Sequence, residues 1–257
     1  MTICVITGAG SGLGRAMALE LAGRGLQVAA LGRRADALNT TASLSQSDRI
    51  IAFPVDVADA SSVATVFNRI EDRLGPVDIL INNAAVYPRQ DFLETSAADF
   101  MATVGINLGG IVACSSATLR GMVARGHGRI LNVSSFADVA PLSGSSAYSV
   151  SKGAARLFTR ALVADIADRF PQIVINDWIP GALATEMGLA SGLDPALAAR
   201  WGAELALMRD PSLSGTIWSM DQELPPPRSL KQRMADRLLR RTPHARRLSA
   251  NDNPATR

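Results

Sequence analysis

Short apolar segments alternate with longer segments of helical periodicity along the first 180 residues of the chain. The longer segments repeat apolar residues every three or four positions, most clearly at 12–25, 59–73, 96–121 and 146–169. The short segments are rich in β-branched residues and lie at 2–6, 26–32, 49–56, 77–84, 128–135, 173–180 and 214–221. Strands that are apolar on both faces and separated by helices are typical of a parallel sheet covered on both sides. The pattern therefore predicts an α/β fold with a doubly wound parallel sheet.

Residues 225–257 differ from the rest of the chain in charge. They contain nine Lys or Arg and two Asp, a net charge of +7, so the other 224 residues carry −4 although the whole chain carries +3. Three prolines at 225–227 mark the end of the compact region, and Leu230, Met234 and Leu238 then recur every four residues between basic side chains. We therefore expect one folded domain over 1–224 and a basic, amphipathic helical extension over 225–257.

Composition narrows the class of protein. Hydrophobic residues make up 47% and charged residues 19%, as in ordinary soluble proteins. No apolar run reaches the roughly 18 residues of a membrane span. The first strand begins at residue 2, which leaves no room for a secretory signal. Cys4 and Cys114 are isolated, as buried thiols in a reducing compartment would be, and no residue cluster has the spacing of a metal site. We therefore expect a cytoplasmic protein that needs no metal.

A glycine-rich turn, TGAGSGLG at 7–14, directly follows the first predicted strand and opens the first predicted helix. Gly8, Gly12 and Gly14 allow a sharp turn and a close approach to a pyrophosphate at the positive N-terminus of that helix. The spacing differs from both the common GxGxxG fingerprint and the phosphate-binding P-loop. A tight turn without a ligand is the structural alternative, but the strand before it and the helix after it favour a nucleotide site.

The end of the second predicted strand bears on which dinucleotide binds. An acidic residue there would bind the ribose 2′-hydroxyl of NAD, whereas arginine accepts the 2′-phosphate of NADP. The chain has Gly32 followed by Arg33 and Arg34. A pair of solvated charges is the alternative, although cations oppose the dipole at a helix N-terminus. We therefore expect NADP in preference to NAD, with Arg33 as the phosphate ligand.

Two further strand ends carry polar residues. Asp56, after the third strand, can accept a hydrogen bond from an adenine amino group, or it can cap the next helix, a role that Asp59 could equally fill. The fourth strand ends in NNAA at 82–85. Small residues there let the backbone pass beside a ribose, and the amides can tie neighbouring strands together.

Tyr148 and Lys152 lie four residues apart on a predicted helix and therefore share one face. A free phenol has a pKa of about 10, too high for a base at neutral pH, and a fixed ammonium beside it favours the phenolate. Ser135 ends the fifth predicted strand on the same rim of the sheet, where a hydroxyl can bind a substrate oxygen. Asn107, on the helix after the fourth strand, could anchor a water between Lys152 and solvent. Each feature has an ordinary structural explanation alone, but together they predict proton-transfer chemistry beside a nucleotide.

The sequence resembles the short-chain dehydrogenase/reductase family in its single-domain form. The resemblance extends over 2–221 and is carried by TGAGSGLG (7–14), Asp56, NNAA (82–85), Asn107, Ser135, YSVSK (148–152) and PGALAT (180–185). It implies a Rossmann-like fold and hydride transfer between a nicotinamide and an alcohol or carbonyl carbon.

The resemblance also implies a role for each matching residue. Tyr148 would be the general acid/base, and Ser135 would polarise the substrate oxygen. Lys152 would lower the pKa of Tyr148 and hold the ribose hydroxyls, while Asn107 would maintain a proton relay. The residues implied for cofactor binding are Gly8, Ser11, Gly12, Leu13, Gly14, Arg33, Asp56, Val57, Asn83, Ala84, Tyr148, Lys152 and, around the nicotinamide carboxamide, Pro180, Gly181 and Thr185.

The chain departs from the family in its C-terminal third. The stretch over 185–215 is shorter than usual, because a helix is predicted to begin at Asp194 and only 186–193 remain to cover the substrate. The chain also continues well beyond the last strand. Three explanations of this extension stay open: a helix packed on its own or a neighbouring subunit, a lid over the active site, or a segment that docks to an acidic carrier protein, a membrane surface or nucleic acid.

The sequence thus predicts an NADP-preferring oxidoreductase that acts on a small-molecule ketone or secondary alcohol. A 3-oxoacyl-thioester reductase is the alternative among enzymes, and a non-catalytic NADP-sensing regulatory protein is the alternative from another class. The resemblance and the small-residue faces of the helices at 96–121 and 146–169 predict a homodimer or homotetramer, with neither nucleic acid nor membrane as a partner. The substrate is not identified, because the segments expected to line its pocket, 86–95, 136–146 and 182–193, hold few polar anchors.

Overall fold

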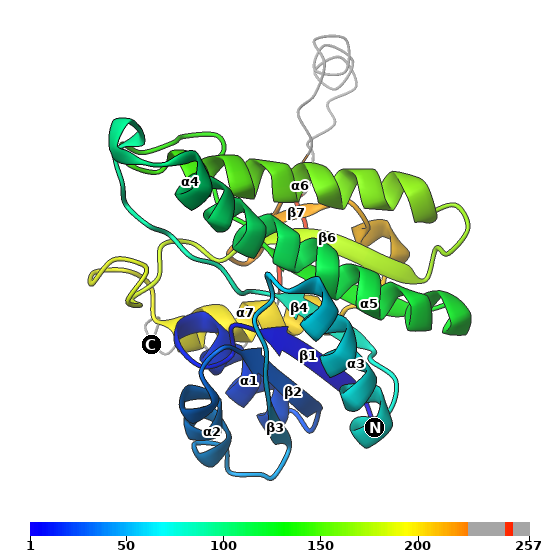
Figure 1. Ribbon diagram of the computed structural model, residues 1–257. Coiled ribbons are helices and arrows are strands. Elements are labelled where there is room, and N and C mark those ends of the chain that lie inside the picture. The colour runs from blue at the N-terminus through cyan, green and yellow to red at the C-terminus, as the bar shows by residue number, and fades with distance from the viewer. Residues whose placement is uncertain (226–244, 249–257) are drawn as a thin grey trace, which may run out of the picture.

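A computed structural model describes residues 1–225 and 245–248, which form one eight-stranded sheet between two layers of helices (Figure 1). The strand order is β3-β2-β1-β4-β5-β6-β7-β8; β8 is antiparallel to β7, and all other neighbours are parallel. The predicted doubly wound α/β fold is confirmed. The strands are β1 Ile3–Thr7, β2 Gln27–Gly32, β3 Ile50–Pro54, β4 Ile79–Asn82, β5 Gly128–Val133, β6 Ile173–Ile179, β7 Ile217–Ser219 and β8 Gln222–Leu224.

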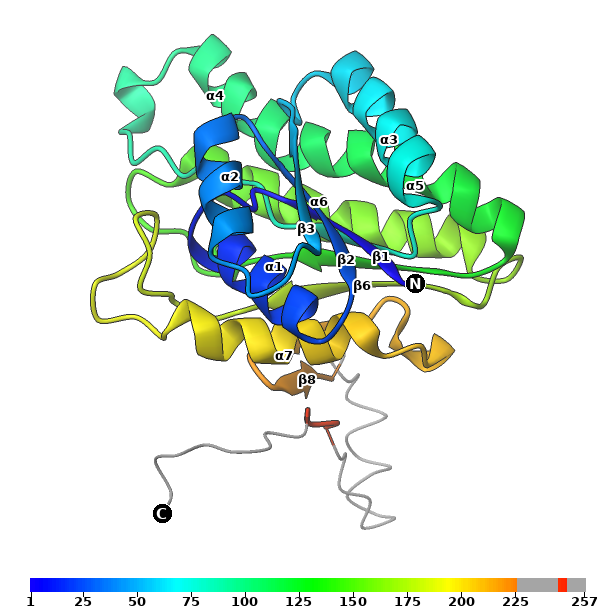
Figure 2. The same cartoon turned by 90° about the horizontal axis from the view of Figure 1, so that it is seen from below.

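Helices α1, α2 and α7 cover one face of the sheet, and α3, α4, α5 and α6 cover the other (Figures 1 and 2). Several begin where the sequence places a capping residue. The Asp194 carboxylate accepts a hydrogen bond from the Ala196 N–H at 2.8 Å, and Pro195 occupies the first turn of α7. The helices are α1 Gly12–Gly23, α2 Ala35–Ser43, α3 Ala60–Leu74, α4 Ala97–Val104, α5 Gly110–Arg125, α6 Ser146–Ile166 and α7 Pro195–Leu207.

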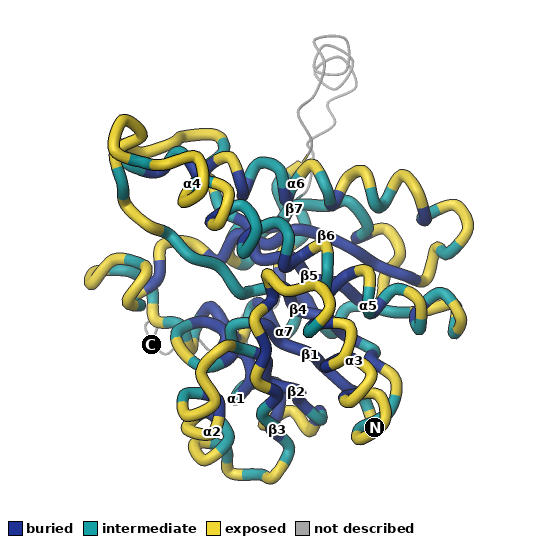
Figure 3. Tube along the Cα trace, in the orientation of Figure 1, coloured by how far each residue is buried: buried dark blue, intermediate teal, exposed yellow. Residues whose placement is uncertain are grey.

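The hydrophobic core has one part on each face of the sheet. Every residue of β1 and β6 is buried, as expected for central strands covered on both sides (Figure 3). On the side of α1 and α7, the Trp178 side chain is fully buried. A Cβ at Gly202 of α7 would lie 2.7 Å from this indole ring, so α7 can pack this closely only because it has no side chain there.

The order of the strands reverses between β1 and β4. The chain proceeds from β1 outward to β2 and β3, and then returns to the other side of β1 to form β4, β5 and β6. In doubly wound sheets, ligands bind in the crevice that opens at the carboxyl ends of the strands at this point. The loop after β6, at the left of Figure 1, extends from that edge.

The helix predicted over 96–121 is longer than the sequence suggested. α4, a π-helical turn at Gly105–Gly109 and α5 form one continuous helix of 29 residues, Ala97–Arg125. It is long and apolar enough, by length and composition alone, to cross a membrane. The sequence analysis counted only uninterrupted apolar residues, whereas this helix interleaves Gly, Ser and Thr. The finding is weak evidence for a span, because core helices pass the same test, and α5 packs on α3, β4 and β5.

The strand predicted over 214–221 is shorter in the structure. β7 covers only the middle of that segment, and Met220 then adopts a positive φ of 51° at the reversal into β8. The indole N–H of Trp178 donates to the Met220 carbonyl at 2.9 Å, which holds this reversal against β6. The antiparallel strand that follows was not expected from the sequence.

Residues 245–248 pack on the same edge of the sheet. Arg246 forms ion pairs with Glu223 at 2.6 Å and with Asp210 at 3.3 Å. Leu248 is only 4% exposed and belongs to the core on the side of α1 and α7. The amphipathic helix predicted around 230–238 lies outside the described residues.

We expect Leu248→Ala to lower the free energy of unfolding by about 2–4 kcal/mol, because truncating a buried leucine removes its contacts and leaves a cavity. Urea denaturation of the full chain measures this change. Leu44→Ala, at a side chain that is 55% exposed, is the matched control, with an expected change within about 0.5 kcal/mol. Equal stability of the two variants would contradict the packing of residues 245–248 described above.

Candidate active site

A large open cavity lies at the carboxyl ends of the strands, over the reversal between β1 and β4. Its volume is about 1460 Å³, compared with roughly 300–1,000 Å³ for the pocket of one drug-sized ligand. It therefore has room for a dinucleotide and a second small molecule. All the predicted cofactor-binding residues line it, as do three of the four predicted catalytic residues, Ser135, Tyr148 and Lys152; Asn107 does not.

The glycine-rich turn after β1 is tied to the end of β4. The Thr7 hydroxyl accepts hydrogen bonds from the backbone N–H groups of Asn83 and Ala84, at 3.0 and 2.9 Å, and Asn83 Nδ2 donates to the Thr7 carbonyl at 2.9 Å. Gly8 has a φ of +68°, and a Cβ there would lie 2.9 Å from Ala84 Cα. A Cβ at Gly14 would collide with the carbonyl oxygen of Gly8. The turn therefore requires glycine at both positions, and the Asn83 amide ties two strands together.

The N-terminus of α1 faces the cavity without a side-chain cap. Ser11, the residue before the helix, makes no capping hydrogen bond, and the first turn contains no acidic residue. The first N–H groups of a helix have no partner within it, so they remain available here to an anion. Gly12 lies close to the loop after β6, because a Cβ there would be 3.1 Å from Thr185 Cγ2. This arrangement fits a pyrophosphate group.

Arg33 and Arg34 follow β2 at the other end of the cavity. Both are exposed, and Arg34 is the residue before α2. Neither guanidinium has a hydrogen bond or ion pair to any residue that the structure describes. Two unpaired cations that line a cavity suit a phosphate group.

Asp59, and not Asp56, caps the helix that follows β3. Its carboxylate accepts hydrogen bonds from the N–H groups of Ser61 and Ser62, at 3.0 and 3.1 Å, and so caps α3. Asp56 accepts only from the N–H of Ala58, at 3.0 Å, and lines the cavity. Asp56 is thus not required as the helix cap.

Tyr148 and Lys152 lie one turn apart near the start of α6, beside the end of β5. Lys152 Nζ donates to the Val133 carbonyl at 2.8 Å and lies 5.7 Å from the centroid of the Tyr148 ring. Ser135 follows β5, lines the same cavity and lies close enough to the Tyr148 phenol to lower its pKa. The predicted phenol, ammonium and hydroxyl are therefore brought together.

Burial has the largest effect on the pKa of the Tyr148 phenol. It raises the pKa of Tyr148 above its ordinary value, although the hydrogen bond with Ser135 lowers it, and the neighbouring Tyr87 raises it further. The sequence suggested a lowered value, because only the effect of a neighbouring ammonium was considered. Burial also lowers the pKa of Lys152 to about 8, so this ammonium loses its proton more readily than a surface lysine.

Asn107 lies in the π-helical turn between α4 and α5 and is fully buried. Its Oδ1 accepts from the Val86 N–H at 2.8 Å, and its Nδ2 donates to the Val86 carbonyl and to the Ser151 hydroxyl, both at 2.9 Å. Asn107 therefore holds the loop after β4 against α6, next to Lys152. The water relay suggested by the sequence stays a prediction.

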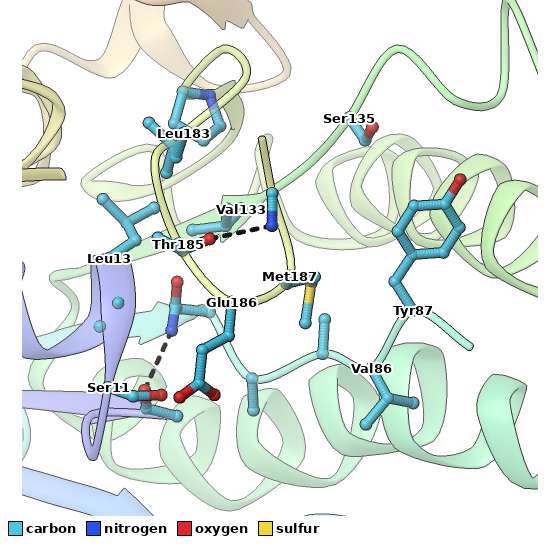
Figure 4. A pocket seen from close by; sticks show the side chains of 18 of the residues that line it. Ser11, Leu13, Val86, Tyr87, Val133, Ser135, Leu183, Thr185, Glu186 and Met187 are labelled. Carbon is cyan, nitrogen blue, oxygen red and sulfur yellow. Dashed lines mark hydrogen bonds between the residues drawn. The ribbon is translucent and has the colours of Figure 1, made fainter. Parts of the chain in front are cut away.

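Tyr87 is a site residue that the sequence analysis missed. Its ring packs against that of Tyr148, with centroids 4.4 Å apart and an interplanar angle of 31°. The Arg89 guanidinium lies 5.4 Å from the Tyr87 centroid on the same loop. Figure 4 shows the Tyr87 side chain beside the cavity near Ser135. The available signal was compositional, since the chain has only two tyrosines and one lies two residues after the NNAA segment.

The loop after β6 closes the cavity on the opposite side. Its base is fixed by two backbone hydrogen bonds, from the Ala184 N–H to the Leu193 carbonyl at 2.9 Å and from the Leu193 N–H to the Ala182 carbonyl at 2.8 Å. Thr185 accepts a hydrogen bond from the Gly188 N–H, and Glu186 extends into the space beside Ser11 (Figure 4). The short segment expected to cover the substrate therefore borders the cavity, while a covering role stays a prediction. In the described part of the chain, no group of three or more His, Cys, Asp or Glu is placed to hold a metal.

Comparison with known proteins agrees with this geometry. The short chain dehydrogenase family profile matches residues 2–194. The chain is 34% identical to L-xylulose reductase of Mesocricetus auratus over 192 residues, which are 74% of this chain and 75% of that one. It is 36% identical to galactitol 2-dehydrogenase (L-tagatose-forming) of Cereibacter sphaeroides over 201 residues, 76% and 77% of the two chains. A crystal structure of a short-chain dehydrogenase from Streptomyces avermitilis is similar with a TM-score of 0.74 and 27% identity, covering 85% of this chain and 88% of that one. The chain therefore belongs to the short-chain dehydrogenase family and is an oxidoreductase that uses a nicotinamide cofactor, NAD or NADP.

Proposed function

We propose that this chain interconverts a ketone and a secondary alcohol with NADP, and that Tyr148 is the general acid/base. The observation that carries the proposal is the position of Tyr148, Lys152 and Ser135 in the same cavity as the glycine-rich turn. A protein that only binds a nucleotide needs the turn. It has no use for a phenol, an ammonium and a hydroxyl grouped beside it.

The residues present fit a dinucleotide along the whole cavity. The uncapped N-terminus of α1 suits the pyrophosphate, and Asp56 and Val57 would hold the adenine half. Pro180, Gly181, Thr185 and Lys152 would hold the nicotinamide half. When bound, the nicotinamide ring supplies or accepts the hydride.

Tyr148 and Ser135 act on the substrate oxygen. In reduction, the Tyr148 phenol donates its proton to the carbonyl oxygen; in oxidation, the phenolate takes the proton from the alcohol. The Ser135 hydroxyl donates a hydrogen bond to the same oxygen and stabilises the negative charge that develops there. Because burial raises the pKa of Tyr148, the phenol holds its proton at neutral pH, as reduction requires.

Lys152 and Asn107 support this step. The Lys152 ammonium, fixed on the Val133 carbonyl, favours the phenolate left after proton transfer. Asn107 positions the backbone of Val86 and the hydroxyl of Ser151, the residue before Lys152, and we propose that it keeps open a path for the proton to solvent.

The preference for NADP depends on Arg33, and turnover with both cofactors tests it. We expect wild-type protein to reduce small or cyclic ketones faster with NADPH than with NADH, in a panel that also contains sugars and acyl thioesters. Arg33→Ala should raise KM for NADPH by about 10- to 100-fold, because charge-assisted hydrogen bonds to a phosphate contribute roughly 1.5–3 kcal/mol. KM for NADH should change by less than about threefold, since NAD has no phosphate at that position.

Arg73→Ala is the control for this measurement. Arg73 is exposed near the end of α3 and does not line the cavity. It should leave both KM values unchanged. A wild-type preference for NADH would overturn the assignment of NADP, and an absence of turnover across the panel would overturn the proposed reaction.

We also propose that the protein is a homodimer or homotetramer. The family resemblance suggests this, and α5 and α6 expose apolar side chains that a neighbouring subunit would cover. These include Val112, which is 41% exposed, and Leu157, which is 58% exposed.

A further inference from the structure

A row of buried polar residues crosses three neighbouring strands below the active site. Asn82 of β4 is in register with Asn132 of β5, which is in register with Asp177 of β6. All three are at most 2% exposed, in strands whose other buried residues are mostly apolar. Ser115 of α5 and Thr159 of α6 bond to this row, so it faces the helix layer that carries the catalytic residues.

The hydrogen bonds along the row all run toward Asp177. Asn82 Nδ2 donates to Asn132 Oδ1 at 2.8 Å, Asn132 Nδ2 donates to Thr159 Oγ1 at 2.9 Å, and Thr159 Oγ1 donates to Asp177 Oδ1 at 2.9 Å. The Thr159 hydroxyl also lies 3.3 Å from the Ala155 carbonyl, but its contact with Asp177 is the shorter of the two. A carboxylate is an acceptor alone, so this direction favours the ionised form of Asp177.

Lys152 lies next to the end of this row. Its Nζ is bonded to the carbonyl of Val133, the residue after Asn132, and Asp177 pairs with Asn132 on the adjacent strand. Lys152 is only 3% exposed, and burial lowers its pKa, whereas the charge of Asp177 raises it. A buried ammonium without a counter-ion would lose its proton. The Asp177 carboxylate therefore stabilises the charged form of Lys152, and no other residue of the proposed mechanism does so.

Opposing effects act on the pKa of Asp177. Burial raises its pKa to about 7, while the hydrogen bond from Thr159 and the charges of Arg156, Lys152 and Arg160, all on α6, lower it. Arg156 is already paired with a carboxylate of the loop after β5, at 2.7 Å. From β5 and β7, the residues in register with Asp177 are Asn132 and Ile217, and neither ionises.

We propose that Asp177 is a positioning residue: its carboxylate, held ionised by the donor chain that starts at Asn82, keeps Lys152 protonated beside Tyr148. The proposal depends on the proposed function only for its effect on turnover. The electrostatic effect on Lys152 exists in the protein without substrate or cofactor, and can be measured there.

The chain has only two lysines, Lys152 and Lys231, which makes this measurement direct. In a Lys231→Arg background, the NMR signal of lysine side chains labelled with carbon-13 reports the ionisation of Lys152 alone. Asp177→Asn keeps the shape of the side chain and removes its charge. We expect it to move the titration of Lys152 to lower pH by about one unit, because the negative charge that favours the ammonium is lost. Asp168→Asn, at an exposed carboxylate after α6, should leave the titration unchanged.

A second pair of variants guards against misfolding of Asp177→Asn. Thr159→Val removes the donor to Asp177 and keeps the carboxylate; it should shift the titration of Lys152 in the same direction by a smaller amount, and Thr159→Ser should restore the wild-type titration. A titration that moves to higher pH, or that stays unchanged in both Asp177→Asn and Thr159→Val, would overturn the proposal.

With any ketone that the chain reduces, the basic limb of the pH profile of kcat/KM should move to lower pH by the same amount in Asp177→Asn, because the ammonium that favours the phenolate is lost earlier. If no substrate is turned over, the proposed function fails while the titration still decides the role of Asp177. A purely structural role would lower stability and leave both the titration and the profile in place.

Discussion

Tyr148→Phe is expected to lower kcat for ketone reduction by about 10²- to 10⁴-fold, the usual contribution of a general acid. Phenylalanine keeps the ring that packs on Tyr87 and removes only the proton donor, so the cavity should retain its shape. Steady-state rates measured by absorbance of the reduced nicotinamide give kcat. Calorimetric titration with NADPH should give a dissociation constant close to that of the wild type.

Tyr87→Phe provides the comparison, because it removes the other hydroxyl of the same ring pair. It should reduce kcat far less than Tyr148→Phe does, because the phenol ring beside Lys152 is that of Tyr148. If Tyr148→Phe binds NADPH normally and loses no reductase activity, Tyr148 is not the acid. The chain would then fit a nucleotide-sensing protein better than an enzyme.

Gly14→Ala should have the second large effect, on cofactor binding. Its Cβ would collide with the Gly8 carbonyl oxygen and lie 2.6 Å from Asn83 Nδ2, so the turn or the end of β4 must move. Overpacking of this kind costs typically 1–3 kcal/mol. If the displaced turn no longer fits the pyrophosphate, the dissociation constant for NADPH should rise by about 5- to 150-fold.

Gly23→Ala, at the end of the same helix, is the matched control. A Cβ at Gly23 meets no atom within 4 Å. The variant should bind NADPH as the wild type does and be equally or slightly more stable, by up to about 1 kcal/mol. Wild-type affinity in Gly14→Ala would show that the close contact between the two glycines does not shape the cofactor site.

The sequence alone was sufficient for the fold and for the grouping of the main site residues. Strands apolar on both faces specify a covered parallel sheet, and because these strands run in the same direction, their carboxyl ends lie on one rim. Residues near those ends, such as those of the glycine-rich turn and Ser135, were therefore expected to meet, and they line one cavity. Tyr148 and Lys152 were expected to lie together because residues four apart on a helix share one face.

Other features depend on contacts between distant segments, which local patterns do not contain. β8 forms because Trp178 of β6 holds the reversal at Met220, and no periodicity in 214–221 signals that bond. The direction of the Tyr148 pKa depends on how deeply the phenol is buried, and spacing on a helix does not reveal burial. Asp177 could have been noticed as an acidic residue inside an apolar strand, but its hydrogen-bond and charge partners lie on α6, a different element.

Residues 245–248, which pair with β8, affect how a C-terminal truncation must be interpreted. Residue 247 forms a β-bridge with Gln222, the Glu223 N–H donates to the Arg246 carbonyl at 3.0 Å, and the Leu248 N–H donates to the Asp221 carbonyl at 2.8 Å. These bonds occupy the outer edge of the sheet, where unpaired strands otherwise promote association with other chains. Deleting all of 225–257 would uncover that edge and promote aggregation. The resulting loss of activity would then be mistaken for the loss of a lid over the active site. A deletion that ends before residue 245 and rejoins the chain keeps the edge covered and tests the extension alone.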